Sequence, residues 1–443
     1  MFSNKDLRKL IIPLVIEQLL AVTIGMADTV MVSSCGEAAV SGISLVDSIN
    51  FLLITLFSSL ATGGAVIASQ YIGRGDHKSA SLAAKQLFYA SLALSAVLGV
   101  IAVFFRKPVL NMVFGSIEAD VMAHAQIYFL LSAISYPFLA VYNAGAALFR
   151  SMGDSRTTML ISILMNTINI VGNAILIYGF QMAAAGAATA SLVSRAVGAI
   201  IITVLLLNPR RIIFYDKLHK PEIHLSMLKS ILQIGVPNGL ENSIFQIGKI
   251  LVASIVSGFG TISITANAVA GNLASLQVIP GMALGMAMIT VVGQCIGAKD
   301  HEAVKKYTKK LMLITYGVVW TMTLLMLLFS KQLLSFYSLS EETTTMTMEV
   351  FIVHGICAVI VWPLAFALPN ALRAANDVRF TMIVSLLSMW IFRIGFSYIL
   401  AIYFNMGILG TWIAMCIDWF CRGACFVIRF ARGKWKNISF IDN

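Results

Sequence analysis

Charged residues are scarce in this sequence. They make up 12% of its 443 residues, about half the share found in an ordinary soluble protein. A chain with so few charges cannot cover a water-facing surface of that size, which excludes a soluble fold. The six cysteines include no CxxC pair and the 32 glycines follow no three-residue period, so neither a disulfide scaffold nor a collagen-like chain fits. Hydrophobic residues reach 59%, which indicates a polytopic helical membrane protein.

Apolar stretches long enough to cross a bilayer recur along the whole chain. Helix is the expected form, because an isolated strand would leave its backbone groups unpaired in lipid. We therefore predict an all-α polytopic membrane protein with 12 transmembrane helices. The predicted spans are 11–33, 46–70, 83–105, 122–147, 157–179, 184–207, 229–257, 264–292, 308–329, 347–371, 379–404 and 408–430.

Lysine and arginine are distributed unevenly between the two sets of loops. Of the 31 in the chain, only Arg106, Lys107 and Lys331 fall on one side, and a few fall within spans. The rest lie on the side that holds both chain ends. Cytoplasmic loops of membrane proteins are enriched in these residues, so we predict a multi-pass protein of the cell (inner) membrane with both termini cytoplasmic. The same rule accounts for the net charge of +11 without a nucleic-acid partner.

The two halves of the chain are repeats of each other. A shift of 224 residues aligns three pairs without a gap: Pro13 with Pro237, Glu17 with Glu241, and Gln70 with Gln294. After a slip of one residue, the segment RSMGDSR at Arg150 meets RAANDVR at Arg373.

Six spans in each repeat give both halves the same orientation. We therefore predict two six-helix bundles related by a pseudo-twofold axis along the membrane normal. The predicted parts are an N-lobe over 1–207, a basic cytoplasmic linker over 208–228, and a C-lobe over 229–443 that ends in a short cytoplasmic tail. Two facing bundles suggest alternating access.

Ionisable residues inside spans are candidates for function, because burying them in lipid is costly. Glu17 and Asp28 lie 11 residues apart, about 20° from three full helical turns, so they share a face. Glu241 repeats Glu17 in the other half. The two glutamates suit the path of a cationic substrate, but each could instead be a buried structural ion. For Glu241 the nearby Lys249 is the expected partner.

Asp28 has potential oxygen-bearing neighbours in the fifth and sixth spans. Asn169 and Asn173 are four residues apart on one helical face, and Ser191 follows in the next span. A carboxylate with amide and hydroxyl oxygens suits Na⁺, which prefers oxygen ligands, and the carboxylate could equally hold a proton. The asparagines could alternatively form interhelical hydrogen bonds.

Near the C-terminus, Arg393 and Asp418 carry opposite charges in adjacent spans, and we predict a structural ion pair. The sequence has no HExxH, GxSxG or Walker motif, so we expect a transporter and no enzyme. Without a nucleotide site, an ion gradient would drive transport, so we expect no cofactor and H⁺ or Na⁺ as the coupling ion. The expected partners are a small-molecule substrate and the lipid bilayer. Nothing indicates an obligate protein partner.

Several motifs, taken in order, resemble the multidrug and toxic compound extrusion (MATE) family over almost the whole length. They are GMADTVMV from Gly25, QYIGRGD from Gln70, LFRSMGD from Leu148, NIVGN from Asn169, and LRAAND from Leu372. The resemblance implies two six-helix lobes that export organic cations or other amphipathic drugs in exchange for H⁺ or Na⁺. It assigns ion coupling to Asp28, with Asn169, Asn173 and Ser191.

This sequence departs from one branch of that family in the C-lobe. That branch carries acidic residues where this chain has Phe245 and Trp362, so a second cation site is expected to be missing. Trp362 becomes a candidate for substrate contact, beside Glu17, Glu241 and Lys249. The alternative function is that of a lipid-linked precursor flippase of the same superfamily. Such a protein needs a cationic cleft for pyrophosphate, whereas the candidates here are mostly acidic.

Overall fold

The computed structural model describes residues 2–115, 117–337 and 339–438, apart from the side chains of residues 23–29. The described residues form helices and connecting loops, with no strand among them. The chain divides into two compact units, Met1–Gly239 and Leu240–Asn443. They are called the first unit and the second unit below. The prediction of an all-α polytopic membrane fold is confirmed.

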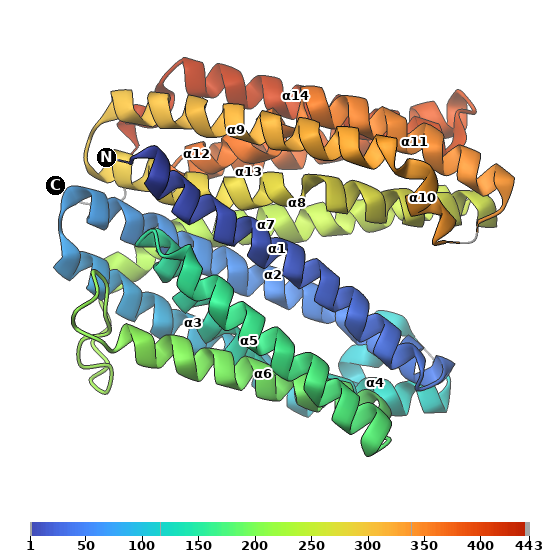
Figure 1. The fold of residues 1–443 in the computed structure, drawn as a ribbon, viewed down its shortest axis with the longest axis horizontal. Coiled ribbons are helices and arrows are strands. Elements are labelled where there is room, and N and C mark those ends of the chain that lie inside the picture. The colour runs from blue at the N-terminus through green and yellow to red at the C-terminus, as the bar shows by residue number, and fades with distance from the viewer. Residues whose placement is uncertain (1, 116, 338, 439–443) are drawn as a thin grey trace. The chain divides into compact units, whose positions relative to one another are not determined.

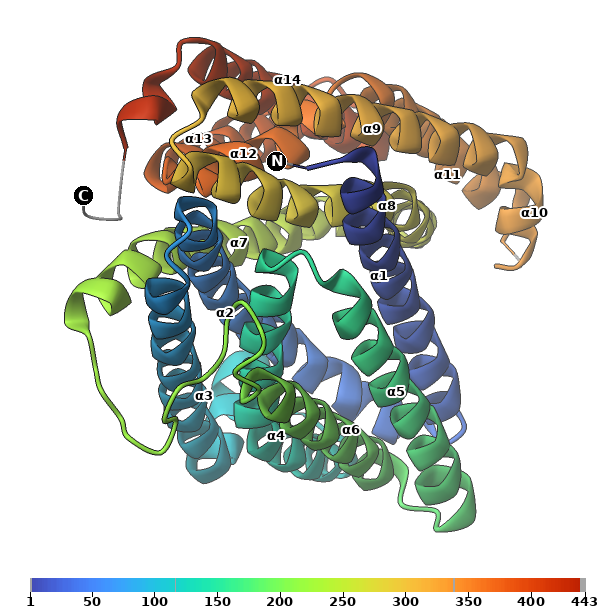
Figure 2. The same ribbon diagram turned by 60° about the vertical axis from the view of Figure 1, so that its left-hand side comes forward.

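The first unit is built from long helices in chain order. Helix α4 packs against α2, α3 and α6, and α5 packs against both α1 and α6 (Figure 2). The helices are α1 (Asn4–Ser33), α2 (Glu37–Arg74), α3 (His77–Phe114), α4 (Ala119–Ser151), α5 (Ser155–Asn173) with its π-helical continuation η1 (Ala174–Gly179), and α6 (Ala183–Leu206) (Figure 1).

The second unit begins within α7 (Leu225–Ser257). Helix α8 packs against α9, α11 and α12, and α14 packs against the π-helical segments η2, η3 and η4. The remaining elements are α8 (Thr261–Gly297), α9 (His301–Leu328), α10 (Ser330–Ser335), α11 (Glu341–Ile360), η2 (Pro363–Ala367), α12 (Leu368–Ala374), α13 (Val378–Ser388), η3 (Met389–Gly395), η4 (Tyr398–Tyr403), α14 (Gly407–Ala431) and η5 (Lys434–Asn437).

Eleven helices in the described part of the chain are long and apolar enough to cross a membrane. Helix α1, which contains residues 23–29, is the remaining predicted span. The span predicted at 347–371 consists of three pieces, α11, η2 and α12. The break falls at Pro363, which has no backbone N–H to donate and therefore interrupts the regular hydrogen-bond ladder.

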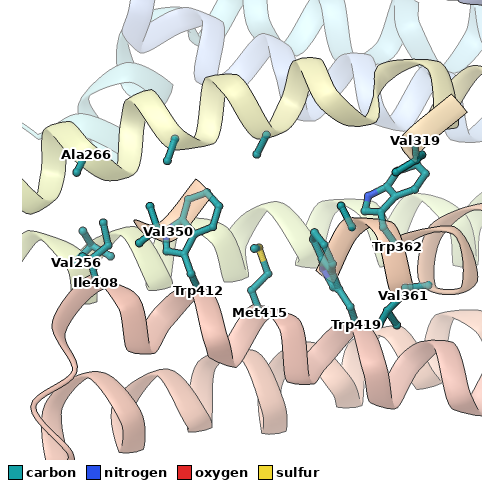
Figure 3. Packing of buried hydrophobic residues seen from close by; sticks show 14 residues of the cluster. Val256, Ala266, Val319, Val350, Val361, Trp362, Ile408, Trp412, Met415 and Trp419 are labelled. Carbon is teal, nitrogen blue, oxygen red and sulfur yellow. The ribbon is translucent and has the colours of Figure 1, made fainter. Parts of the chain in front are cut away.

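Aromatic side chains form much of the core of the second unit. Trp412, Met415 and Trp419 project from one face of α14 toward α8, and Trp362 packs in the same buried cluster (Figure 3). The three tryptophans are each less than a tenth exposed. This part of the second unit is therefore closed by large rings together with small aliphatic side chains.

Repeat-related aspartates start equivalent helices in the two units. The Asp76 carboxylate accepts a hydrogen bond from the Ser79 backbone at the start of α3 (3.0 Å). Asp300 accepts one from Ala303 at the start of α9 (2.9 Å). Hydrogen bonds from Ser79 hold the pKa of the Asp76 carboxyl below its ordinary value, because they stabilise the charged form. Both carboxylates accept from backbone N–H groups in the first helical turn, which have no partner within the helix.

The segment between α6 and α7 is held against α3. The Tyr89 hydroxyl donates to the Leu218 carbonyl at 2.8 Å, and the Gln86 side chain donates to the Glu222 carbonyl at 2.7 Å. Gln86 also accepts from the backbone of His224 at 3.1 Å. These bonds satisfy loop backbone groups that would otherwise need water.

Gly63 in α2 lies where α2 meets the first turns of α7. A Cβ at this position would sit 2.5 Å from the carbonyl oxygen of Ile231, so the helices touch through their backbones, as small residues allow. We expect Gly63→Ala to destabilise the protein by about 1–3 kcal/mol through overpacking. Gly317→Ala is the matched control, since nothing lies within 4 Å of its Cβ. Thermal unfolding in detergent would compare the two, and equal melting temperatures would contradict this packing.

Candidate functional site

A chain of amide and hydroxyl groups joins α5 to α6 in the first unit. Asn169 donates to the Ser191 hydroxyl at 3.1 Å, and Asn173 donates to the Asn169 side-chain oxygen at 3.4 Å. Both asparagines are buried, with 6% and 1% of their surface exposed. Their spacing of four residues places them one above the other on α5. The structure therefore brings together three of the four residues predicted for ion coupling.

The fourth residue, Asp28, has its side chain outside the described residues. It belongs to α1 (Asn4–Ser33), which packs against α5. The role of Asp28 stays a prediction. Among the described side chains, no group of three or more His, Cys, Asp or Glu residues is placed to hold a metal ion. The predicted Na⁺ ligands, an aspartate and two asparagines, do not form a group of that kind.

Glu17 is buried in the first unit and its carboxylate is paired. Its Oε1 lies 3.4 Å from the Arg150 guanidinium, and its Oε2 accepts from the Thr158 hydroxyl at 2.9 Å. The residues belong to α1, α4 and α5. The charge that made Glu17 a candidate for binding a cationic substrate is thus already compensated within its own unit.

Glu241 has the equivalent arrangement in the second unit. Its Oε1 lies 2.7 Å from the Arg373 guanidinium, which also donates to the Asn370 side chain at 2.9 Å. Lys249, which we expected as the partner, is exposed and pairs with no carboxylate among the described residues. The reason is geometric, because eight residues along a helix amount to about 80° of rotation away from Glu241.

Arg150 and Arg373 are the ion-pair partners that sequence reasoning missed. They were noted only as parts of the repeated loop motifs at the ends of α4 and α12. The signal was present, since the same internal repeat aligns Glu17 with Glu241 and Arg150 with Arg373. Two residues of opposite charge that recur together in both repeats, at offsets of 224 and 223 residues, indicate the same contact within each repeat.

The two pairs differ in one hydrogen bond. Thr158 donates to Glu17 in the first unit, whereas Thr381, its repeat equivalent, donates to the Val378 carbonyl at 2.9 Å. Among the described residues, no donor reaches Oε2 of Glu241. The second pair therefore depends more heavily on Arg373 alone.

Asp418 is fully buried in α14 and faces two arginines. Arg422 donates to both of its carboxylate oxygens at 3.2 Å, and Arg393 lies 3.8 Å from Oδ2. Ser388 also donates to Oδ1. The structure thus brings together the predicted Arg393–Asp418 pair and adds Arg422 to it.

The two C-lobe positions where relatives were expected to carry acids hold aromatic rings that pack inward. Trp362 stacks on Phe366 with ring centroids 5.3 Å apart, and Phe245 contacts Phe366 edge-on at 6.2 Å. Trp362 is 4% exposed. In this arrangement Trp362 fills the core of the second unit.

Asp47 is a further carboxylate inside the first unit. It lies ten residues into α2, where it accepts hydrogen bonds from the Tyr128 hydroxyl at 3.0 Å and from Asn50 at 3.2 Å. Both donors are neutral, so this carboxylate is solvated by protein groups rather than paired with a cation at close range.

Comparison with known proteins places this geometry in a family. A sequence model of the MatE family matches residues 13–175 and 237–399, and the second match begins 224 residues after the first. This offset is the one found between the internal repeats.

Two curated relatives cover nearly the whole chain. The "Uncharacterized transporter YisQ" of Bacillus subtilis is 26% identical over 96% of this chain and 93% of its own length. A "Probable multidrug resistance protein NorM" of Thermotoga maritima is 26% identical over 98% of this chain and 93% of its own.

Solved structures share the fold at lower identity. An outward-facing multidrug resistance MATE family transporter of the MOP superfamily superposes with a TM-score of 0.89 at 20% identity, covering 98% of this chain and 97% of that one. A MOP superfamily transporter from Pyrococcus furiosus, described as having a binding pocket of reverse polarity, gives a TM-score of 0.87 at 21% identity, with the same coverage.

The Glu241–Arg373 pair is testable by a double-mutant cycle. Glu241→Gln should lower the free energy of unfolding by about 3 kcal/mol, because it leaves a buried guanidinium unpaired. Adding Arg373→Gln should cost less than the sum of the two single changes. Unfolding of the purified protein in mixed detergent measures each value. Lys249→Gln should change stability by no more than about 0.5 kcal/mol. Additive losses from the two single changes would refute the pair.

Proposed function

The chain belongs to the MatE family of multidrug efflux transporters, and on this premise we propose that it is a secondary antiporter. It exports amphipathic drugs, organic cations among them, in exchange for H⁺ or Na⁺. That it is a multi-pass membrane transporter and not an enzyme follows from the family itself. The uneven loop charges support a place in the inner membrane with both termini in the cytoplasm.

The single observation that carries the proposed coupling is the buried polar chain of Asn169, Asn173 and Ser191. Its members come from α5 and α6, two helices apolar enough on average to cross a membrane. Together with the Asp28 carboxylate of α1, these amide and hydroxyl oxygens would provide ligands for Na⁺ or a site for H⁺. Nothing in this donor set requires a further cofactor.

The ion pairs made by Glu17 and Glu241 narrow the choice of coupling residue. Glu17 and Glu241 each contact an arginine within their own unit. A carboxylate that accepts H⁺ or Na⁺ would first have to give up that contact. We therefore assign both glutamates a structural role and leave coupling to Asp28.

Coupling requires that the ion favour one conformation of the protein over another, because a ligand shifts an equilibrium only through its differential affinity. In the proposed cycle, H⁺ or Na⁺ enters the Asp28 site from outside and stabilises the state with low drug affinity. Each positive charge that enters with the membrane potential supplies about 2.3 kcal/mol per 100 mV.

The flippase alternative can be weighed again with the structure in hand. The acidity of the candidate residues no longer argues against a flippase, because the carboxylate charges of Glu17 and Glu241 are each paired with an arginine. The family match over both repeats and a relative named as a probable multidrug resistance protein support drug export instead.

Efflux of ethidium from proteoliposomes tests the proposal under separately imposed Na⁺ and H⁺ gradients. Wild-type protein should export ethidium with one of the two gradients, which identifies the coupling ion. Asp28→Asn should reduce export to the level of empty liposomes. The neutral amide cannot take up H⁺, and it lacks the negative charge that compensates Na⁺.

Asp47→Asn is the matched control and should retain export, since it removes another carboxylate of the same unit. Export by Asp28→Asn at the wild-type rate under both gradients would contradict the assignment and return coupling to Glu17 or Glu241. Absence of wild-type export together with binding of a lipid-linked precursor would favour the flippase.

A second test concerns the oxygen ligands. Asn169→Ala should raise the ion concentration needed for half-maximal efflux by about tenfold, because it removes a buried polar contact to the ion. Asn166→Ala is the control, as Asn166 lies on the same helix and bonds only weakly to Ser162 (3.4 Å). Equal ion dependence in the two variants would show that α5 does not bind the coupling ion.

A further inference from the structure

The second unit contains a buried cluster in which positive charge is in excess. Arg393 and Arg422 share the single carboxylate of Asp418. Lys249 lies one turn after Phe245 on the same face of α7, and the Arg393 guanidinium lies 5.3 Å from the Phe245 ring. Among the described residues of this cluster, two guanidinium groups thus face one carboxylate, and the exposed Lys249 lies at its edge. An unbalanced buried charge is costly, so such a cluster is expected to attract a further anion.

Hydrogen-bond donors in the cluster are left over as well. Among the described residues, no acceptor reaches the Nε–H of Arg393, the Nε–H of Arg422 or the indole N–H of Trp419. Arg422 is 3% exposed and Trp419 is 4% exposed, so water does not readily satisfy these groups. Buried donors are nearly always paired in folded proteins, and three unpaired donors in one cluster indicate a missing acceptor.

Aromatic rings form the walls around these donors. Both guanidinium groups lie 5.3 Å from the centre of the Phe245 ring, and Arg422 also lies 5.2 Å from that of Phe366. Trp419 meets Phe366 edge-on at 5.5 Å, and its indole lies beside Trp362 in the close view of this core (Figure 3). Flat apolar walls favour a flat apolar ligand.

Burial increases from Lys249 through Arg393 to Arg422. Lys249 is exposed and Arg393 is only partly buried, while Arg422 and Asp418 lie deeper. An anion arriving at Lys249 would therefore meet Arg393 before it reaches Arg422. The order of burial gives the cluster an outer and an inner cation on one approach.

We propose that Arg393, Arg422 and Lys249 form a binding site for the anionic group of an aromatic organic acid. The guanidinium groups hold the carboxylate in place of Asp418, and Phe245 and Phe366 contact the ring. The inference deepens the proposed export function, on which it rests, by giving the anionic group of a substrate a binding site of its own. It assigns recognition of negative charge to the second unit.

The test is equilibrium binding of 2-naphthoate to the purified protein in phosphatidylcholine nanodiscs. The comparison ligand is 2-naphthalenemethanol, which has the same rings and no charge. Wild-type protein should bind the acid about tenfold more tightly than the alcohol, as expected for hydrogen bonds to a charged group. Arg422→Gln and Arg393→Gln should each remove most of this preference and leave binding of the alcohol unchanged.

Asp418→Asn separates the proposal from simple misfolding. It removes the internal carboxylate that competes for the arginines, so affinity for 2-naphthoate should rise several-fold. Arg195→Gln is the matched control, because Arg195 is an arginine within a span of the first unit, where it donates to Ser135 at 2.7 Å. It should leave the preference for the acid unchanged.

Three results would overturn the proposal. They are equal affinity for acid and alcohol, no gain from Asp418→Asn, and loss of 2-naphthoate binding when phosphatidylglycerol replaces phosphatidylcholine, which would assign the site to lipid headgroups. The experiment uses no ion gradient. It can therefore fail while gradient-driven ethidium export succeeds, or succeed while that export fails.

Discussion

The burial of one glutamate against one arginine in each unit is the interaction on which the arrangement of the helices depends. In the first unit it ties α1 to α4, and in the second it ties α7 to α12. In both cases the first helix of a repeat is joined to its fourth span. Helices in lipid gain little from burying apolar surface against each other, so a charged contact that cannot be replaced by lipid fixes which helices are neighbours.

The two units share this helix arrangement but bury different polar groups. The first unit buries neutral oxygens and amides along α5 and α6, a lining suited to a small cation. The second unit buries guanidinium groups among aromatic rings, a lining suited to an organic anion. The two units thus share a helix arrangement and differ in the polar groups they bury, and on the proposals above each would have its own ligand preference.

Much of the fold could be predicted from the sequence, because lipid imposes simple rules. Length and apolar content located the spans, and the repeated Pro13–Pro237 and Glu17–Glu241 matches located the two halves. The partner of Glu241 could not be found in this way. Lys249 is near in sequence, but helical rotation turns it aside, and Arg373 is brought close only by tertiary packing. The depth of the aromatic ring at Trp362 likewise depends on neighbours from other helices.

The wide helical turns near the C-terminus have a consequence for the position of Arg393. A π turn holds one residue more than an α turn, and moving that extra residue along a helix rotates the intervening residues by about 100°. Arg393 lies inside η3 (Met389–Gly395), one of two such segments in succession. Sliding the wide turn past Arg393 would swing its guanidinium away from Asp418 while the backbone stays hydrogen-bonded throughout. The position of the wide turn would then decide whether Asp418 faces one arginine or two.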